Sequence, residues 1–127
     1  MPITLENVEF TYMATTPYER KALQGVSLTV YKGEFVAVIG HTGSGKSTLV
    51  HHLNGLLKPS AGKVTIDGLD ISGKGEAVKK ARHQVGMVFQ YPEHQIFAET
   101  VFEDIAFGPR NKGMQEKEVK QQVQAAM

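Results

Sequence analysis

The most informative part of the sequence is Gly40-His41-Thr42-Gly43-Ser44-Gly45-Lys46-Ser47. It matches the pattern G-x-x-x-x-G-K-[ST], in which glycines let the backbone close around phosphate so that its N–H groups point inward. We expect Lys46 to reach the β- and γ-phosphates through charge-assisted hydrogen bonds, and Ser47 to place its hydroxyl on Mg²⁺. The sequence therefore predicts a site for the triphosphate of a nucleotide, with ATP and Mg²⁺ as the bound species.

The segments on either side of this loop have the character that the motif requires. Residues 34–39 are nearly continuously apolar, which predicts a strand covered on both faces in a parallel sheet. Leucine and valine recur at helical spacing over residues 49–57, ahead of Pro59, so a helix is expected after the loop. The alternative, an accidental glycine-rich turn, is disfavoured by the complete motif in this setting.

Alternating apolar and polar residues predict antiparallel strands outside this core. Two of them precede the loop, at residues 3–12 and 26–30, and the slip in alternation at Glu6-Asn7 indicates a bulge. Residues 64–71 are expected to form a third unit, a short hairpin around Asp67-Gly68. The two early strands are expected to pair with each other.

The second half of the chain is predicted to be mostly helical. A basic helix is expected over residues 73–82, followed by a second buried strand at 85–89. Residues 100–103 have the spacing of a capping box for a helix that Gly108-Pro109 closes. An apolar stripe over residues 119–127 predicts a final helix.

Composition indicates an ordinary folded chain and favours no class of charged partner. The 127 residues are 41% hydrophobic and 21% charged, and 14 basic against 13 acidic residues leave a formal charge of +1. So small a net charge does not predict binding to nucleic acid or to an anionic membrane surface. The sequence contains no cysteine, which excludes disulfides and thiolate metal sites. No window is apolar for long enough to span a bilayer, so we expect any membrane contact to be made through a partner.

Three stretches outside the phosphate loop resemble the ATP-binding cassette (ABC) family: Phe10-Thr11-Tyr12, residues 60–68 (Ser-Ala-Gly-Lys-Val-Thr-Ile-Asp-Gly) and residues 85–90 (Val-Gly-Met-Val-Phe-Gln). The resemblance covers the whole chain. It implies an α/β fold, namely a P-loop NTPase core with an antiparallel β subdomain, truncated at the start of a helical subdomain. The parts would be residues 1–33 and 62–72 (antiparallel β subdomain), 34–57 and 84–90 (nucleotide-binding core) and 91–127 (start of the helical subdomain).

The resemblance also implies roles for three residues, each with a simpler alternative. Tyr12 would stack on adenine, although an aromatic residue at a strand end often only packs the strand face. Thr48 would assist at the α-phosphate, although a threonine at a helix start can equally make a local hydrogen bond. Gln90 would contact Mg²⁺ and the attacking water, although a lone glutamine commonly just caps a strand.

A narrower resemblance points to the energy-coupling factor transporter ATPases. It is carried by residues 90–97 (Gln-Tyr-Pro-Glu-His-Gln-Ile-Phe), 104–109 and 52–59, together with His41 in the phosphate loop. Such an ATPase would be peripheral on the cytoplasmic face of the membrane. Its partners would be a second ATPase subunit, a transmembrane coupling protein and a membrane component that captures a vitamin or metal ion. The resemblance places the docking surface near residues 91–108, whose apolar side chains could equally pack the helical subdomain.

Other motifs of the family do not occur in these 127 residues. The sequence has no Leu-Ser-Gly-Gly-Gln signature, no apolar strand ending in Asp-Glu and no switch histidine, so the chain resembles roughly the first half of such a subunit. We therefore expect ATP binding without efficient hydrolysis. A non-catalytic nucleotide-binding module and another importer subtype remain alternatives. A GTPase is disfavoured because residues 111–114 (Asn-Lys-Gly-Met) lack the aspartate of a guanine-reading motif.

Overall fold

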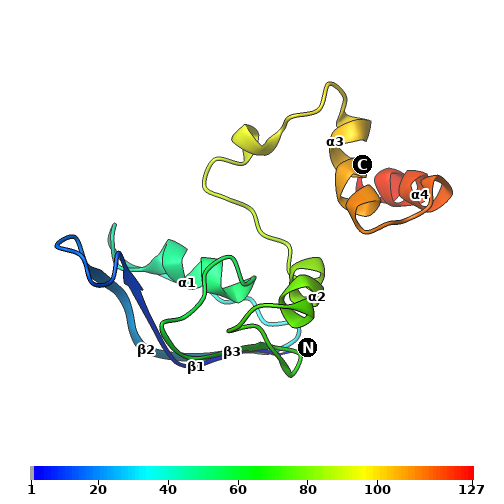
Figure 1. The fold of residues 1–127 in the computed structure, drawn as a ribbon. Helices are drawn as coiled ribbons and strands as arrows, with labels where there is room; N and C mark the ends of the chain where they lie inside the picture. Colours follow the sequence, from blue (N-terminus) through cyan, green and yellow to red (C-terminus); the bar gives the residue numbers. More distant parts are fainter. Residues whose placement is uncertain (1) are drawn as a thin grey trace. The chain divides into compact units, whose positions relative to one another are not determined.

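The computed structural model describes residues 2–127, whose contacts divide the chain into two units, Met1–Gly86 and Met87–Met127 (Figure 1). The elements of the first unit are β1 (Ile3–Tyr12), β2 (Arg20–Val30), α1 (Lys46–Leu53), β3 (Ala61–Ile66), β4 (Leu69–Asp70) and α2 (Glu76–Gln84). Those of the second are η1 (Pro92–Gln95), α3 (Val101–Asn111) and α4 (Glu116–Ala126). None of the helices within residues 2–127 has the length and apolar character needed to cross a membrane.

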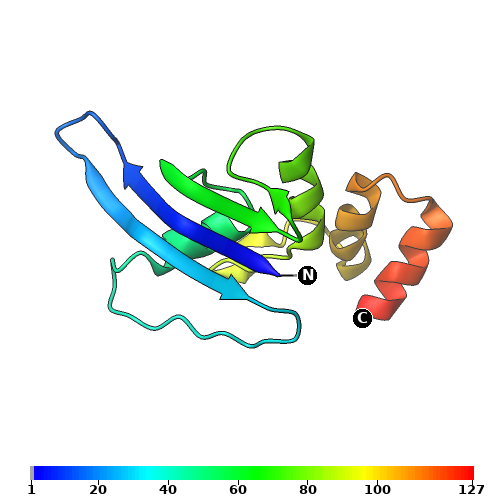
Figure 2. The same ribbon diagram turned by 90° about the horizontal axis from the view of Figure 1, so that it is seen from below.

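The first unit is built on an antiparallel sheet with strand order β2-β1-β3-β4 (Figure 2). The predicted pairing of the two early strands is confirmed, although β2 begins at Arg20 and is therefore longer than expected. The predicted bulge is also confirmed, because the register of β1 against β2 shifts between Leu5 and Val8 and Asn7 has a φ of 47°. The hairpin from β3 to β4 turns on Asp67 and Gly68, both at positive φ, as the sequence predicts.

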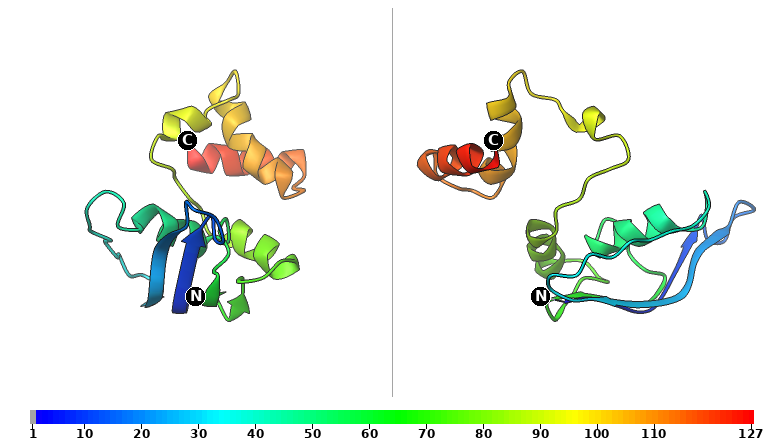
Figure 3. Two further views of the ribbon diagram at one scale, coloured as in Figure 1. Left: turned by 60° about the vertical axis from the view of Figure 1, so that its left-hand side comes forward. Right: turned by 180° about the vertical axis from the view of Figure 1, so that it is seen from behind.

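Helices α1 and α2 lie on the same side of this sheet (Figures 1 and 3). Their inward faces contribute Leu49 from α1 and Val78 and Ala81 from α2 to one apolar core. The sheet and the chain that follows β4 supply the remaining buried members, which are Leu5, Val8, Leu23, Val64, Ile66 and Ile71. Each large side chain buried in this way stabilises the fold by about 1.5–3 kcal/mol, so the core holds the start of α1 against the sheet.

The prediction of two buried parallel strands is wrong for the described structure. Residues 34–39 and 85–89 form neither strand nor helix. Phe35 is 97% exposed, Ile39 93% and Val88 76%. A strand of a parallel sheet needs hydrogen-bonding neighbours, and within residues 2–127 the sheet of β1 to β4 pairs with neither segment. The apolar sequence is therefore present without the pairing that would bury it.

Two helix boundaries also differ from the sequence prediction. Helix α1 ends at Leu53, so the leucines at 56 and 57 follow it. Helix α3 continues through Gly108-Pro109 to Asn111 and stops before Gly113, whose φ of 77° ends the helical path. Sequence reasoning placed these ends at the nearest proline, whereas proline only removes one amide donor and does not always end a helix.

The second unit is a pair of helices with its own small core. Ala106 of α3 packs against Val119 and Val123 of α4, as the predicted apolar stripe requires. The Thr100 hydroxyl accepts a hydrogen bond from the Glu103 amide at 3.2 Å, which is the first half of the predicted capping box. The Glu103 carboxylate does not form the second half with Thr100, because it accepts from the Arg110 guanidinium instead.

Gly62 and Gly68 form a matched pair for testing how β1 and β3 pack. Both have positive φ (84° and 77°), but a Cβ at Gly62 would overlap the backbone carbonyl of Asn7, whereas one at Gly68 would meet open space. We expect Gly68→Ala to lower the free energy of unfolding by roughly 1–2 kcal/mol, and Gly62→Ala to lower it by about 1–3 kcal/mol more. Urea unfolding measures both. Equal losses would contradict the close approach of β3 to the bulge.

Arg110 is expected to make the second unit sensitive to acid. Its guanidinium donates to the Glu116 carboxylate at 2.8 Å, and hydrogen bonding followed by charge attraction lowers the pKa of Glu116 from 4.5. Because the folded pKa is the lower one, this contribution is full above pH 4.5 and is lost as the pH falls through the folded value. Arg110→Gln should reduce the helicity of α4 at pH 7, measured by Cα chemical shifts of residues 116–126. The difference from wild type should shrink as the pH falls below 4.5 and through the folded pKa of Glu116. A difference that does not change with pH would contradict this role of the ion pair.

Candidate nucleotide-binding site

The phosphate loop, residues 40–47, ends where α1 begins. Gly45 occupies the N-cap position with a φ of 94°, and no side chain caps the helix. The first helical hydrogen bond runs from the Leu49 amide to the Gly45 carbonyl at 2.8 Å. The amides ahead of it lie before the first helical bond and are not capped by a side chain, which makes the start of α1 suited to an anion.

A side chain would meet close neighbours at two glycines of this loop, and at Gly45 the neighbour is backbone. A Cβ at Gly45 would come within 2.6 Å of the Ala22 carbonyl oxygen on β2, and one at Gly40 within 2.6 Å of the Ser44 hydroxyl. The first of these contacts is with backbone, which cannot move aside as a flexible side chain can. The loop is therefore held closely against β2, and its backbone remains open to a ligand.

Lys46 closes the loop on itself. Its ammonium donates hydrogen bonds to the carbonyl oxygens of Gly40 at 2.7 Å and His41 at 2.8 Å. It also lies 3.4 Å from the Ser44 hydroxyl. These three acceptors belong to the predicted phosphate-binding residues, so the structure brings the ammonium and the loop together. Phosphate oxygens would compete for the same donor, since an ammonium offers three N–H groups.

Tyr12 and Thr48 are also brought together. Their hydroxyl groups are 3.0 Å apart and hydrogen-bonded, with Thr48 buried and Tyr12 39% exposed at the end of β1. The Tyr12 ring makes an edge contact with Phe10, with centroids 4.8 Å apart. The Phe10 contact is the strand-face packing considered for Tyr12, whereas the Thr48 hydroxyl bonds a residue 36 positions away and does not make the local bond considered for it. Stacking on adenine and contact with the α-phosphate stay predictions, and the exposed part of the tyrosine ring leaves room for the first.

The remaining predicted site residues have few contacts. Thr42 and Ser47 are exposed, and the His41 ring nitrogen Nδ1 lies 3.0 Å from the Thr42 carbonyl oxygen. Gln90 is exposed and belongs to the second unit, whereas all the others belong to the first. Its role at Mg²⁺ and water stays a prediction.

Arg20 is a residue of this site that sequence reasoning missed. Its guanidinium donates to the Gly43 carbonyl at 3.3 Å and so places a second cation beside the phosphate loop. The pairing of β1 with β2 places Arg20 opposite Tyr12, and this pairing could have pointed to Arg20 as a site residue. Because the predicted second strand began six residues later, that pairing could not be read from the alternation of apolar residues.

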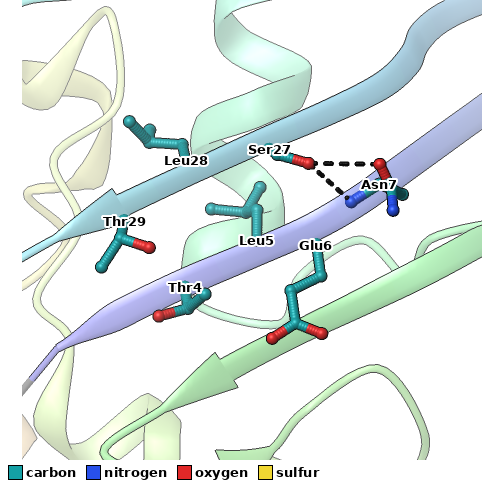
Figure 4. Close-up of a pocket in the computed structure, with 7 residues that line it drawn as sticks. All are labelled: Thr4, Leu5, Glu6, Asn7, Ser27, Leu28 and Thr29. Carbon is teal, nitrogen blue, oxygen red and sulfur yellow. Dashed lines mark hydrogen bonds between the residues drawn. The ribbon is translucent and has the colours of Figure 1, made fainter.

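A second hollow, on β1 and β2, does not compete for this role (Figure 4). Its lining residues are Thr4, Leu5, Glu6, Asn7, Ser27, Leu28 and Thr29. The Asn7 amide and side chain are both occupied by the Ser27 hydroxyl, at 2.9 and 3.3 Å. The one charged residue among these seven is a carboxylate, which disfavours a polyphosphate. In the described part of the chain, no three His, Cys, Asp or Glu side chains are grouped closely enough to hold a metal ion.

Comparison with known sequences gives consistent matches. A profile of the family described as ABC transporter matches residues 23–127. Two relatives named energy-coupling factor transporter ATP-binding protein EcfA2 align over all 127 residues. The protein from Caldanaerobacter subterraneus subsp. tengcongensis is 58% identical and that from Clostridium acetobutylicum 55%. The chain spans 44% of the length of each relative.

Solved structures are similar in the same way. The ATP-binding cassette MJ0796, in a dimeric post-hydrolysis state bound to ADP and phosphate, matches with a TM-score of 0.82 and 30% identity over 97% of this chain and 54% of its own. The protein cbiO1 from Clostridium perfringens, part of the ABC transporter complex cbiONQ, matches with a TM-score of 0.78 and 34% identity over 94% of this chain and 46% of its own. This likeness confirms the predicted fold class, a P-loop NTPase core with an antiparallel β subdomain. The chain belongs to the ABC transporter family.

Proposed function

We propose that this chain is the ATP-binding part of the ATPase subunit of an energy-coupling factor importer, which couples Mg-ATP binding and hydrolysis to uptake of a vitamin or metal ion. The observation that carries the proposal is the geometry of the phosphate loop. The Lys46 ammonium donates hydrogen bonds to the carbonyls of Gly40 and His41, and no side chain caps the start of α1. The names of the relatives from Caldanaerobacter and Clostridium support the importer subtype.

The triphosphate would be held by the backbone of residues 40–47, the Lys46 ammonium and Thr48, with adenine on Tyr12. The glycine positions support this, because side chains at Gly40 and Gly45 would fill the loop or strike β2. Ser47 is exposed on the first turn of α1, so its hydroxyl is accessible to the Mg²⁺ that accompanies ATP. That ion would supply charge neutralisation between the phosphates. Gln90 would orient Mg²⁺ and the attacking water.

The partners that we propose are a second ATPase subunit, a transmembrane coupling protein and a membrane component that captures the substrate. Exposed apolar side chains in the second unit support a docking surface, which comprises Ile96, Phe97, Val101 and Phe107. Phe97 and Phe107 make an edge contact with ring centroids 4.8 Å apart, and they remain 65% and 50% exposed. The subunit would lie peripherally on the cytoplasmic face of the membrane.

We also propose the three-part division into residues 1–33 with 62–72, 34–57 with 84–90, and 91–127. Support for the middle part comes from the exposed apolar segments 34–39 and 85–89, which suit pairing with further strands. The alternative of a non-catalytic nucleotide-binding module uses the same loop. The two functions differ in turnover and not in binding.

Lys46→Ala should abolish most of the binding of Mg-ATP. Losing one or two charge-assisted hydrogen bonds, each worth about 1.5–3 kcal/mol, weakens affinity by at least roughly tenfold. The matched control is Lys32→Ala, which removes an exposed lysine from the connection between β2 and α1, ahead of the phosphate loop. Isothermal titration calorimetry measures both. Equal affinity of Lys46→Ala and wild type would remove the basis of the proposed function.

The 127-residue chain should bind Mg-ATP and release phosphate no faster than Lys46→Ala does. The physical reason is that general-base catalysis and transition-state stabilisation need groups that the family places in motifs absent from this sequence. A phosphate-release assay at saturating ATP measures the rate. Turnover well above that of the variant would show that residues 1–127 contain a catalytic base of their own.

A further inference from the structure

Four residues form a closed strand–helix cluster between β1 and α1: Phe10, Tyr12, Thr48 and His52. The His52 Nδ1 donates to the Thr48 carbonyl at 2.7 Å, and the Thr48 hydroxyl is bonded to that of Tyr12 at 3.0 Å. The Phe10 ring completes the circuit, with edge contacts to Tyr12 at 4.8 Å and to His52 at 4.9 Å. Each member therefore touches two others.

Stability alone does not account for the histidine in this cluster. His52 is fully buried, and a carbonyl only accepts, so Nδ1 carries the proton of this hydrogen bond. The Nε2 atom has no hydrogen-bond partner among residues 2–127. A buried polar atom without a partner opposes folding. The Thr48 carbonyl does not depend on the imidazole, because the His52 amide already bonds it within the helix.

The position of the cluster, between the end of β1 and the start of α1, suggests a role for His52 other than stabilising the fold. Phe10 and Tyr12 are two residues apart on one face of β1, and Thr48 and His52 are one turn apart on one face of α1. Thr48 follows Lys46 and Ser47 directly. The cluster therefore joins the strand end that bears Tyr12 to the first turn of the helix behind the phosphate loop.

We propose that His52 is a positioning residue for the nucleotide base. Through its contact with Phe10, which packs against Tyr12, it holds the Tyr12 ring at a set distance from the phosphate loop, so that one ligand meets both at once. The inference rests on the proposed function, in which Tyr12 stacks on adenine and the loop binds the triphosphate. Preorganisation of this kind strengthens binding of a ligand that spans both points and does not affect one that reaches only the loop.

The test compares two ligands, Mg-ATP and Mg-tripolyphosphate, by calorimetry on the whole 127-residue chain. His52→Phe keeps an aromatic ring beside Phe10 and removes both nitrogens. It should fold at least as stably as wild type, weaken ATP binding by about fivefold to tenfold and change tripolyphosphate affinity by less than about twofold. His51→Ala, one residue away on α1, is the control and should change neither. Phe10→Leu removes the ring that contacts both Tyr12 and His52. It should weaken ATP binding and leave tripolyphosphate affinity unchanged, as His52→Phe does, so the test still decides if His52→Phe misfolds.

The double variant of His52→Phe with Tyr12→Ala tests whether His52 affects ATP binding through Tyr12. If His52 acts through Tyr12, His52→Phe causes no further loss of ATP affinity once Tyr12 is alanine. Additive losses, or equal weakening of both ligands, would overturn the positioning role and leave the phosphate site intact. If wild type binds neither ligand, the proposed function itself fails. If it binds both equally tightly, adenine stacking fails and the role of His52 fails with it.

Discussion

The close contact between the phosphate loop and β2 is the constraint on which the rest of the site depends. The Ala22 carbonyl on β2 leaves no space for a Cβ at Gly45, so this position takes a glycine, in a left-handed conformation. Helix α1 begins at the next residue. That entry leaves the first helical amides without a side-chain cap. The core under Leu49 then holds the helix start in place, so the loop does not have to order itself around an anion.

Cationic and aromatic side chains from different elements of the first unit lie around the phosphate loop and the start of α1. Lys46 comes from the helix and Arg20 from the opposite strand, and both donate to loop carbonyls. Tyr12 reaches the same region from β1 and is tied to Thr48. The loop therefore joins two cationic side chains and one exposed aromatic ring, which is the set of groups expected for a ligand with a polyanionic end and a planar end.

The unpaired apolar segments, residues 34–39 and 85–89, expose apolar side chains to water. Phe35, Ile39 and Val88 are strongly exposed, although their sequences have the composition of buried strands. Side chains of this kind in water favour association, whether with further strands or with other proteins. Among the solved structures similar to this chain, one is a dimeric cassette and another is part of a transporter complex.

Local features could be predicted from the amino-acid sequence, since they depend on neighbours along the chain: the phosphate loop, the antiparallel strands with their bulge at Asn7, the Asp67-Gly68 turn and the apolar stripe of α4. Features that depend on residues far away in the chain are visible only in the folded structure. Residues 34–39 have a strand composition but pair with no strand among residues 2–127, and the pattern of apolar residues cannot reveal whether a partner strand is present. Arg20 beside the loop and His52 beneath Phe10 likewise follow from strand register and helix packing, because a hydrogen bond between residues far apart in sequence leaves no periodic signal.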